Sequence, residues 1–292
     1  MGQVVGAALV SHHPGLMQTD AFRIRMGDGS DSDLIAGYER LRARMDAVDA
    51  DTLMIFDSHW FTTGYHLIDG GAQYEGAYVS DEMPWYLSGV RYDYRGAPDL
   101  ARLVEEAGTE RGVMSKVSAE TNLPRHYATI NLVTKLGRGE RVVSVSTCQN
   151  CQPHHYLESG AVIREAIRRS DARVLLLASG ALSHRFNAID WAQKHPRIYH
   201  ETNVSSPHNV AMDKEAIALF EQGRHDRILE QWDAVFRPLP WEGFGGHYLQ
   251  MVGALGGAAC RAKGTPLSAY ENARGTGNIH IWFDVASEEI PA

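Results

Sequence analysis

Histidines follow three apolar runs along the chain, at points where a buried strand would end. They are His12 after the run at 4–10 ("VVGAALV"), His59 after 52–56 ("TLMIF") and His184 after 174–178 ("VLLLA"). Neighbouring parallel strands end at the same rim of a sheet, and ligands bind in α/β folds at that rim. We therefore expect these imidazoles to converge, although any one of them alone could be an ordinary loop or capping histidine.

A site built on these histidines needs a carboxylate. Two imidazoles and one carboxylate hold mononuclear iron and leave positions open for substrate and oxygen, while zinc hydrolases use a similar set around a water molecule. Glu242 in "PLPWEGFGGHYL" (238–249) is the candidate, because the glycines that follow it allow the backbone to approach a ligand closely. On local sequence alone, a helix-capping role explains Glu242 equally well.

The order of elements predicts one α/β domain over residues 1–292. Continuous apolar runs, including a fourth at 142–145, are typical of strands buried on both faces. Helical patterns alternate with these runs and continue in the last third of the chain, at 31–48, 98–112, 156–169, 209–223 and 244–260. This alternation predicts a mostly parallel central sheet with helices on both faces.

Composition narrows the function classes. The chain has 292 residues and a formal net charge of −8, without a basic cluster, so we expect no nucleic-acid partner. It has no run of eighteen apolar residues and no secretory signal pattern, so we expect a cytoplasmic protein without a membrane span. Fourteen histidines favour metal or proton-transfer chemistry.

The segment "CQNC" has the spacing of a zinc or redox pair, formed by Cys148 and Cys151, and two histidines follow it closely. Because the sequence holds no second pair of this spacing, we expect free buried thiols at a strand end. His154 could instead line the substrate pocket, since it follows a predicted strand.

Several of these motifs together resemble the class III extradiol ring-cleavage dioxygenases, the superfamily of the protocatechuate 4,5-dioxygenase catalytic subunit. The resemblance covers almost the whole chain and is greatest for the branch that contains homoprotocatechuate 2,3-dioxygenase and 2-aminophenol dioxygenase. It rests on the segments "SHHPG" (11–15), "FDSHWF" (56–61), "YEGAYVSDEMPWYL" (74–87), "ASGALSHRF" (178–186), "WEGFGGHYL" (241–249) and "GTGN" (275–278).

The resemblance implies that His12, His59 and Glu242 bind Fe(II), with Mn(II) as an alternative, and that His184 is the catalytic acid and base. A second family histidine aligns with Tyr127, next to His126. One of these two side chains could donate a hydrogen bond to oxygen or substrate, and ordinary packing at a helix start is an equally good explanation.

Further side chains near these motifs are candidate pocket residues. Strand alternation directs His13 away from His12, which makes it a pocket residue rather than a ligand. Trp241 lies beside Glu242 and could form an aromatic wall, as could Trp60 and Trp85, although large aromatic residues near a cleft usually belong to the core.

The implied activity is the Fe(II)-dependent cleavage of a substituted catechol such as 3,4-dihydroxyphenylacetate by O2, to a 2-hydroxymuconic semialdehyde-type product. A 2-aminophenol or a methoxy-catechol is the alternative substrate, and a zinc-dependent hydrolase is the alternative from another class. The implied partners are the small aromatic substrate and O2, in a homo-oligomer or with a small accessory subunit.

Overall fold

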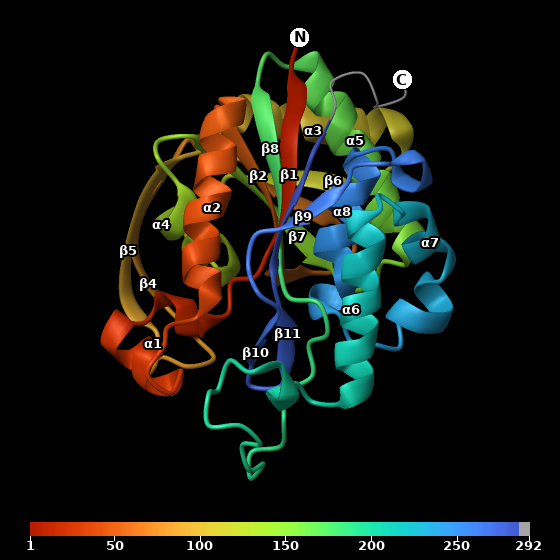
Figure 1. Ribbon diagram of the computed structural model, residues 1–292. Helices are drawn as coiled ribbons and strands as arrows, with labels where there is room; N and C mark the ends of the chain where they lie inside the picture. Colours follow the sequence, from red (N-terminus) through yellow and green to blue (C-terminus); the bar gives the residue numbers. More distant parts are fainter. Residues whose placement is uncertain (286–292) are drawn as a thin grey trace.

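An eight-stranded sheet forms the centre of the computed structural model, which describes residues 1–285 (Figure 1). In spatial order its strands are β6 (Ser115–Ser118), β3 (His66–Asp69), β7 (Arg141–Cys148), β2 (Thr52–Thr62), β8 (Arg173–Ser179), β1 (Gln3–Val10), β12 (His280–Phe283) and β9 (Gly264–Pro266). The four strands from β7 to β1 are mutually parallel, whereas β12 runs antiparallel to its neighbours β1 and β9, and β3 runs antiparallel to β7. The expectation of a mostly parallel sheet is confirmed.

Helices cover both faces of this sheet, as predicted (Figure 1). One face packs against α3 (Pro98–Arg111), α5 (Pro153–Arg169) and α8 (Gly246–Ala254), and the other against α2 (Asp33–Val48) and α4 (Tyr127–Leu136). Strand alternation divides the core between the faces: within β8, Leu176 belongs to the first cluster and Leu177 to the second. Burial on both faces explains why the strands read as continuous apolar runs.

Shorter helices extend these layers. The structure places α1 (Asp20–Met26) after β1, and α6 (Pro207–Glu221) and α7 (His225–Glu230) beyond the long segment that follows β8. The predicted helix at 244–260 is wrong in its extent, because α8 covers only Gly246–Ala254. Left-handed backbone at Phe244 (φ 58°) precedes it, and left-handed Gly256 (φ 106°) follows it.

Two small hairpins lie outside the main sheet. One consists of β4 (Gln73–Val79) and β5 (Ser88–Arg95), and the other of β10 (Glu271–Ala273) and β11 (Thr276–Asn278). The turns of both hairpins carry residues that line the pocket described below.

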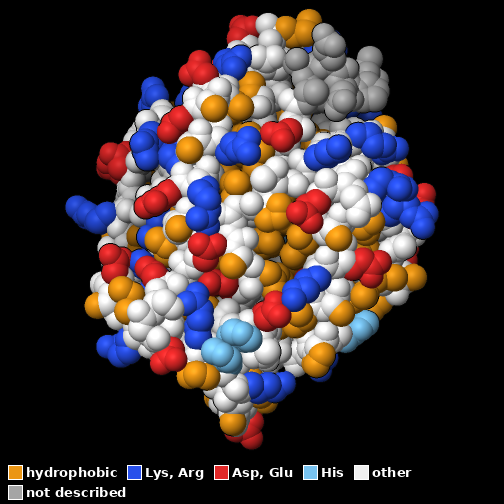
Figure 2. Space-filling view, viewed as in Figure 1, with side chains coloured by type: hydrophobic (Ala, Val, Ile, Leu, Met, Phe, Trp, Pro, Cys, Tyr) orange, Lys and Arg blue, Asp and Glu red, His pale blue; other side chains and the backbone are white. Residues whose placement is uncertain are grey.

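Charged side chains of both signs are interspersed on the face shown in Figure 2, with hydrophobic side chains between them. The net charge of −8 is therefore not gathered into a single acidic field on this face. Within residues 1–285, no helix combines the length and the apolar character needed to cross a membrane.

Candidate active site and metal centre

Three side chains from distant parts of the chain meet at the carboxyl end of the parallel strands. The Oε1 atom of Glu242 lies 3.1 Å from His12 Nε2 and 2.7 Å from His59 Nε2. Within the described part of the chain, these three residues are the one group of His, Cys, Asp or Glu side chains whose donor atoms lie close enough to share an ion. The structure thus brings together the three candidate ligands.

The position and the tautomer of His12 follow from the end of β1 and its neighbours. Asn131 Nδ2 donates to the His12 carbonyl (2.9 Å), and His12 Nδ1 lies 2.9 Å from Ser179 Oγ at the end of β8. Because the Ser179 hydroxyl donates its proton to the Ala128 carbonyl (2.8 Å), it accepts a hydrogen bond from His12 Nδ1–H. This leaves Nε2 unprotonated and facing Glu242, the form that ligates a metal.

His59 lies inside β2, not beyond its end. The sequence predicts a strand that stops at residue 56, but β2 continues to Thr62 with an interruption of its pairing with β7 between Phe56 and Phe61. The Asp57 carboxylate accepts hydrogen bonds from the backbone N–H groups of His59 (2.8 Å) and Trp60 (2.9 Å). This irregularity lets the strand present an imidazole at the rim.

Glu242 is held by an unusual backbone segment. Three successive residues after it have left-handed conformations: Gly243 (φ 55°), Phe244 (φ 58°) and Gly245 (φ 72°). A Cβ atom at Gly243 would lie 2.9 Å from Ser58 Cβ, so the glycine allows close approach to β2, as the sequence suggested. The Glu242 Oε2 atom accepts a hydrogen bond from the Ala181 backbone N–H (2.5 Å).

The charges of these groups fit a divalent metal ion. Burial alone would raise the pKa of Glu242, but the neighbouring imidazoles hold it well below its ordinary value. Burial likewise opposes protonation of His59, yet hydrogen bonds to the Glu242 and Glu82 carboxylates raise its pKa to about 10. A carboxylate that raises the pKa of the His59 imidazole attracts a cation in the same way, and the donor set of two nitrogens and one oxygen is that of facial metal sites.

His184 and Tyr127 lie beside the three candidate ligands. His184 Nε2 is 3.7 Å from Glu242 Oε1, and the Tyr127 hydroxyl is 2.6 Å from His59 Nε2. Burial lowers the pKa of His184, although Glu242 opposes this shift, so the imidazole is neutral at neutral pH. Burial and the Glu242 charge raise the pKa of Tyr127, so its phenol keeps its proton.

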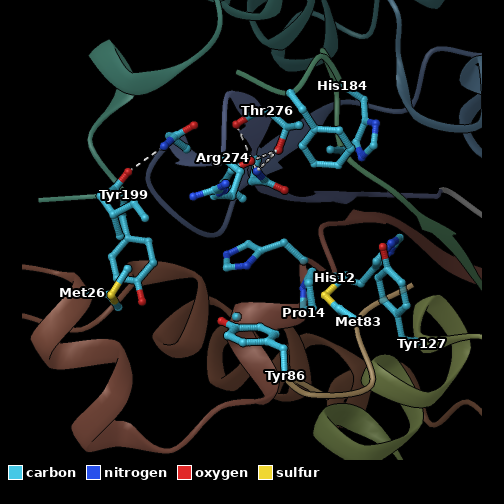
Figure 3. A pocket seen from close by; sticks show the side chains of 18 of the residues that line it. His12, Pro14, Met26, Met83, Tyr86, Tyr127, His184, Tyr199, Arg274 and Thr276 are labelled. Atoms are coloured by element: carbon cyan, nitrogen blue, oxygen red, sulfur yellow. Dashed lines mark hydrogen bonds between the residues drawn. The ribbon is translucent and has the colours of Figure 1, made fainter. Parts of the chain in front are cut away.

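A cavity of about 470 Å³ opens on these groups (Figure 3). Its volume is within the range of pockets that enclose small organic ligands. Its wall is mostly apolar and aromatic, and includes Pro14, Phe22, Met26, Met83, Trp85, Tyr86, Phe186, Ile198 and Tyr199. His13 also lines it, and burial and the nearby His12 lower its pKa to about 3.

Three predicted site residues lie outside this cavity. His126 precedes α4 and lines a separate small hollow with Asp57 and Trp60. His154 is exposed in the first turn of α5, where it packs against His155. Trp241 is buried among core aromatic residues, so its indole belongs to the core although the next residue is Glu242.

Sequence reasoning missed other residues of the site. Glu82 Oε1 lies 3.7 Å from His59 Nδ1, and Arg274 and Tyr199 line the cavity. His247 is fully buried, and neither ring nitrogen has a hydrogen-bond partner among the described residues. Glu82 lies within the motif at 74–87 and Arg274 directly precedes the motif at 275–278, so both motifs could have drawn attention to these residues, whereas Tyr199 lies in a segment without a local pattern.

The cysteine pair at 148 and 151 contains two free thiols, as predicted. Cys148 is buried, and the half-buried Cys151 Sγ lies 3.5 Å from His66 Nε2. Among residues 1–285 one imidazole contacts the pair, so the described residues do not supply the four ligands of a structural zinc site.

The fold and the site together define a class: an α/β protein with a candidate mononuclear metal centre at the carboxyl end of its parallel strands. The family model described as the catalytic LigB subunit of aromatic ring-opening dioxygenase matches residues 6–283, so the chain belongs to this family and is a ring-opening dioxygenase. The expected family and enzyme class are confirmed, and the zinc-hydrolase alternative is set aside.

The chain is also similar to individual proteins whose names describe ring-cleaving dioxygenases. The chain is 27% identical to 3,4-dihydroxyphenylacetate 2,3-dioxygenase of Escherichia coli over 227 residues, which are 77% of this chain and 80% of the relative. It is 26% identical to the 2-aminophenol 1,6-dioxygenase beta subunit of a Pseudomonas species, over 78% of each chain. The crystal structure of the uncharacterized protein JW3007 from Escherichia coli K12 has the same fold, with a TM-score of 0.61 and 16% identity over 95% of this chain and 99% of that one.

Proposed function

We propose that this chain, acting as a single catalytic domain, is an Fe(II)-dependent extradiol dioxygenase. It opens a substituted catechol such as 3,4-dihydroxyphenylacetate with O2 beside the two hydroxyl-bearing carbons, and forms a 2-hydroxymuconic semialdehyde-type product. The observation that carries the proposal is the His12, His59 and Glu242 group, of which His12 and Glu242 line an apolar cavity. The 3,4-dihydroxyphenylacetate-cleaving relative supports the choice of substrate.

In this proposal, His12, His59 and Glu242 hold Fe(II), or Mn(II) in its place. When bound, the metal supplies a template for both substrate oxygens and for O2, and a route for electrons between them. The Ser179 and Asp57 contacts of the two histidine segments keep the ligands oriented before the metal binds. The apolar cavity wall limits the access of water to the reacting atoms.

His184 moves protons in this scheme. A neutral imidazole can accept the phenolic proton as the catechol binds through both oxygens, and can return it when the ring opens. Its Nε2 atom, 3.7 Å from a candidate ligand oxygen, lies on the side of the cavity where the substrate oxygens would be. Transfer by one positioned group typically accelerates a reaction by about 10²- to 10⁴-fold.

Tyr127 donates a hydrogen bond. Its phenol keeps its proton because burial and Glu242 raise its pKa, and its hydroxyl lines the cavity beside His59. We assign this hydrogen bond to an oxygen atom of the substrate or of O2 that would lie beside His59. His126 has no such role, because it lines the other hollow.

The test is anaerobic reconstitution of metal-free protein with Fe(II), Mn(II) or Zn(II), followed by air and a substrate. We expect O2 uptake and a yellow product with 3,4-dihydroxyphenylacetate and Fe(II). The panel includes protocatechuate, catechol, a methoxy-catechol and 2-aminophenol. Activity with Zn(II) but none with Fe(II) or Mn(II), or ring opening without O2 uptake, would contradict the proposal.

Cleavage of a 2-aminophenol is the second candidate function, because the aminophenol relative is 26% identical over 78% of each chain. An amine and a hydroxyl on neighbouring carbons also allow chelation through two atoms. The same panel decides between the two. Since that relative is a beta subunit, we also propose assembly into a homo-oligomer or with a small accessory subunit, which sedimentation of the purified chain would test.

A further inference from the structure

The cavity extends well beyond the candidate metal ligands. In Figure 3, His12, Tyr127 and His184 lie toward one side, and Met26 and Tyr199 toward the other. Phe22, Tyr86 and Ile198 also line this cavity. A catechol ring bound at the ligand end would therefore direct a ring substituent toward this outer part.

Arg274 is the unusual residue between the two sides (Figure 3). Among the residues that line the cavity, only Glu242 and Arg274 belong to the Asp, Glu, Lys and Arg types. Within residues 1–285, the Arg274 guanidinium has no hydrogen bond or ion pair.

The backbone holds Arg274 at the tip of a tight turn. Arg274 and Gly275 are the two residues between β10 and β11, and both have positive φ, 55° and 103°. A two-residue hairpin of this kind ordinarily has Asn or Asp at its first position, so an arginine there is strained. The turn is fixed nonetheless: the Arg274 carbonyl accepts from the Asn187 N–H (2.9 Å), and the Gly275 carbonyl accepts from the Ser205 N–H (2.8 Å).

Arg274 is solvent-exposed and lines the cavity. Burial raises the pKa of Tyr86, and the Arg274 charge opposes this shift, so the two groups are within electrostatic range of each other across the outer part. An unpaired cation beside a mostly apolar wall favours an anionic group on whatever occupies the space, because a carboxylate forms charge-assisted hydrogen bonds with a guanidinium.

We propose that Arg274 determines substrate specificity by binding a carboxylate on the ring substituent, so that the substrate class is catechols with an anionic side chain. This inference rests on the proposed function. It assigns no catalytic role to Arg274, because the reacting atoms lie at the ligand end of the cavity.

The test compares 3,4-dihydroxyphenylacetate with its neutral, nearly isosteric amide, 3,4-dihydroxyphenylacetamide, in the Fe(II) enzyme. For the unaltered chain, we expect kcat/KM for the acid to exceed that for the amide by about tenfold or more, mainly through KM. In Arg274→Gln this ratio falls toward one because the acid loses its advantage, and in Arg274→Lys it is intermediate. The control is Arg102→Gln, which removes an exposed arginine on α3 and leaves the ratio unchanged.

Each outcome has one reading. An acid-to-amide ratio that is the same in the unaltered chain and in Arg274→Gln overturns the inference, as does an equal loss of activity toward both substrates. An acid that is no better than the amide in the unaltered chain overturns it as well. Failure of the proposed function itself is different: neither compound then supports O2 uptake by the unaltered chain.

Discussion

Asp213 in α6 gives a prediction about pH and stability that follows from burial. Its side chain is fully buried and accepts hydrogen bonds from the Ser183 backbone N–H (3.0 Å), the Ser183 hydroxyl (2.6 Å) and the Tyr270 hydroxyl (2.6 Å). In the described chain no Lys or Arg pairs with it. Ser183 precedes His184, so this carboxyl group anchors the segment that carries the proposed acid and base.

The magnitude follows from the pKa of this group. Burial raises the pKa of Asp213 from 3.8 to about 7, although the hydrogen bonds from Ser183 and Tyr270 oppose the shift. Between pH 4 and 7 the folded chain keeps a proton that the unfolded chain has lost, so the free energy of unfolding falls as the pH rises. At about 1.4 kcal/mol for each pH unit, the loss amounts to ~4 kcal/mol at pH 8.

Asp213→Asn removes this titration, because an amide stays neutral. We expect the free energy of unfolding of the variant, relative to the unaltered chain, to rise by ~4 kcal/mol between pH 4 and 8. The assay is urea unfolding of metal-free protein at pH 4, 5, 6, 7 and 8, which excludes proton release by a metal. Asp190→Asn, at an exposed aspartate, is the control. Parallel pH profiles for Asp213→Asn and the unaltered chain would refute the reasoning.

Three further predictions concern the proposed site. His184→Ala should keep its metal, as measured by metal analysis, and lose about 10²- to 10⁴-fold in kcat; normal turnover would exclude the assigned proton transfer. Tyr127→Phe should reduce kcat/KM about tenfold, whereas His126→Ala should have little effect, and the reverse order would exchange their roles. His12→Ala should abolish metal binding, whereas His13→Ala should retain the metal and change only KM, so a metal-free His13→Ala protein would contradict the ligand assignment.

The sheet could be predicted because its pattern is local. Strands buried on both faces are continuously apolar, and such runs give the central strands and the rim where His12 and His59 lie. The full length of β2 could not be predicted in this way. Polar residues continue the strand after Phe56 because the Asp57 carboxylate satisfies backbone donors within the irregular part, a long-range arrangement that alternation of residue types does not encode.

The residues that line the outer part of the cavity could not be predicted from the sequence, for a related reason. Met26, Tyr199 and Arg274 come from a helix end, a long irregular segment and a hairpin tip, and only the tertiary structure brings them together. The same cause explains why two residues predicted to line the pocket lie outside it. Position next to a motif suggested pocket roles for His154 and Trp241, but helix geometry exposes the first and core packing buries the second.

Two different kinds of backbone structure position the candidate ligands. The two histidines are on strands of the central sheet or next to them, where ladder hydrogen bonds fix the backbone. Glu242 instead precedes a left-handed segment that contains Phe244, a residue type for which positive φ is unfavourable. Such strain persists only where the surroundings enforce it. Here the backbone at Gly243 lies where an added Cβ atom would meet Ser58, and the Ala181 N–H donates a hydrogen bond to Glu242. The strained segment places a buried negative charge between two imidazoles, an arrangement that a bound cation would stabilise.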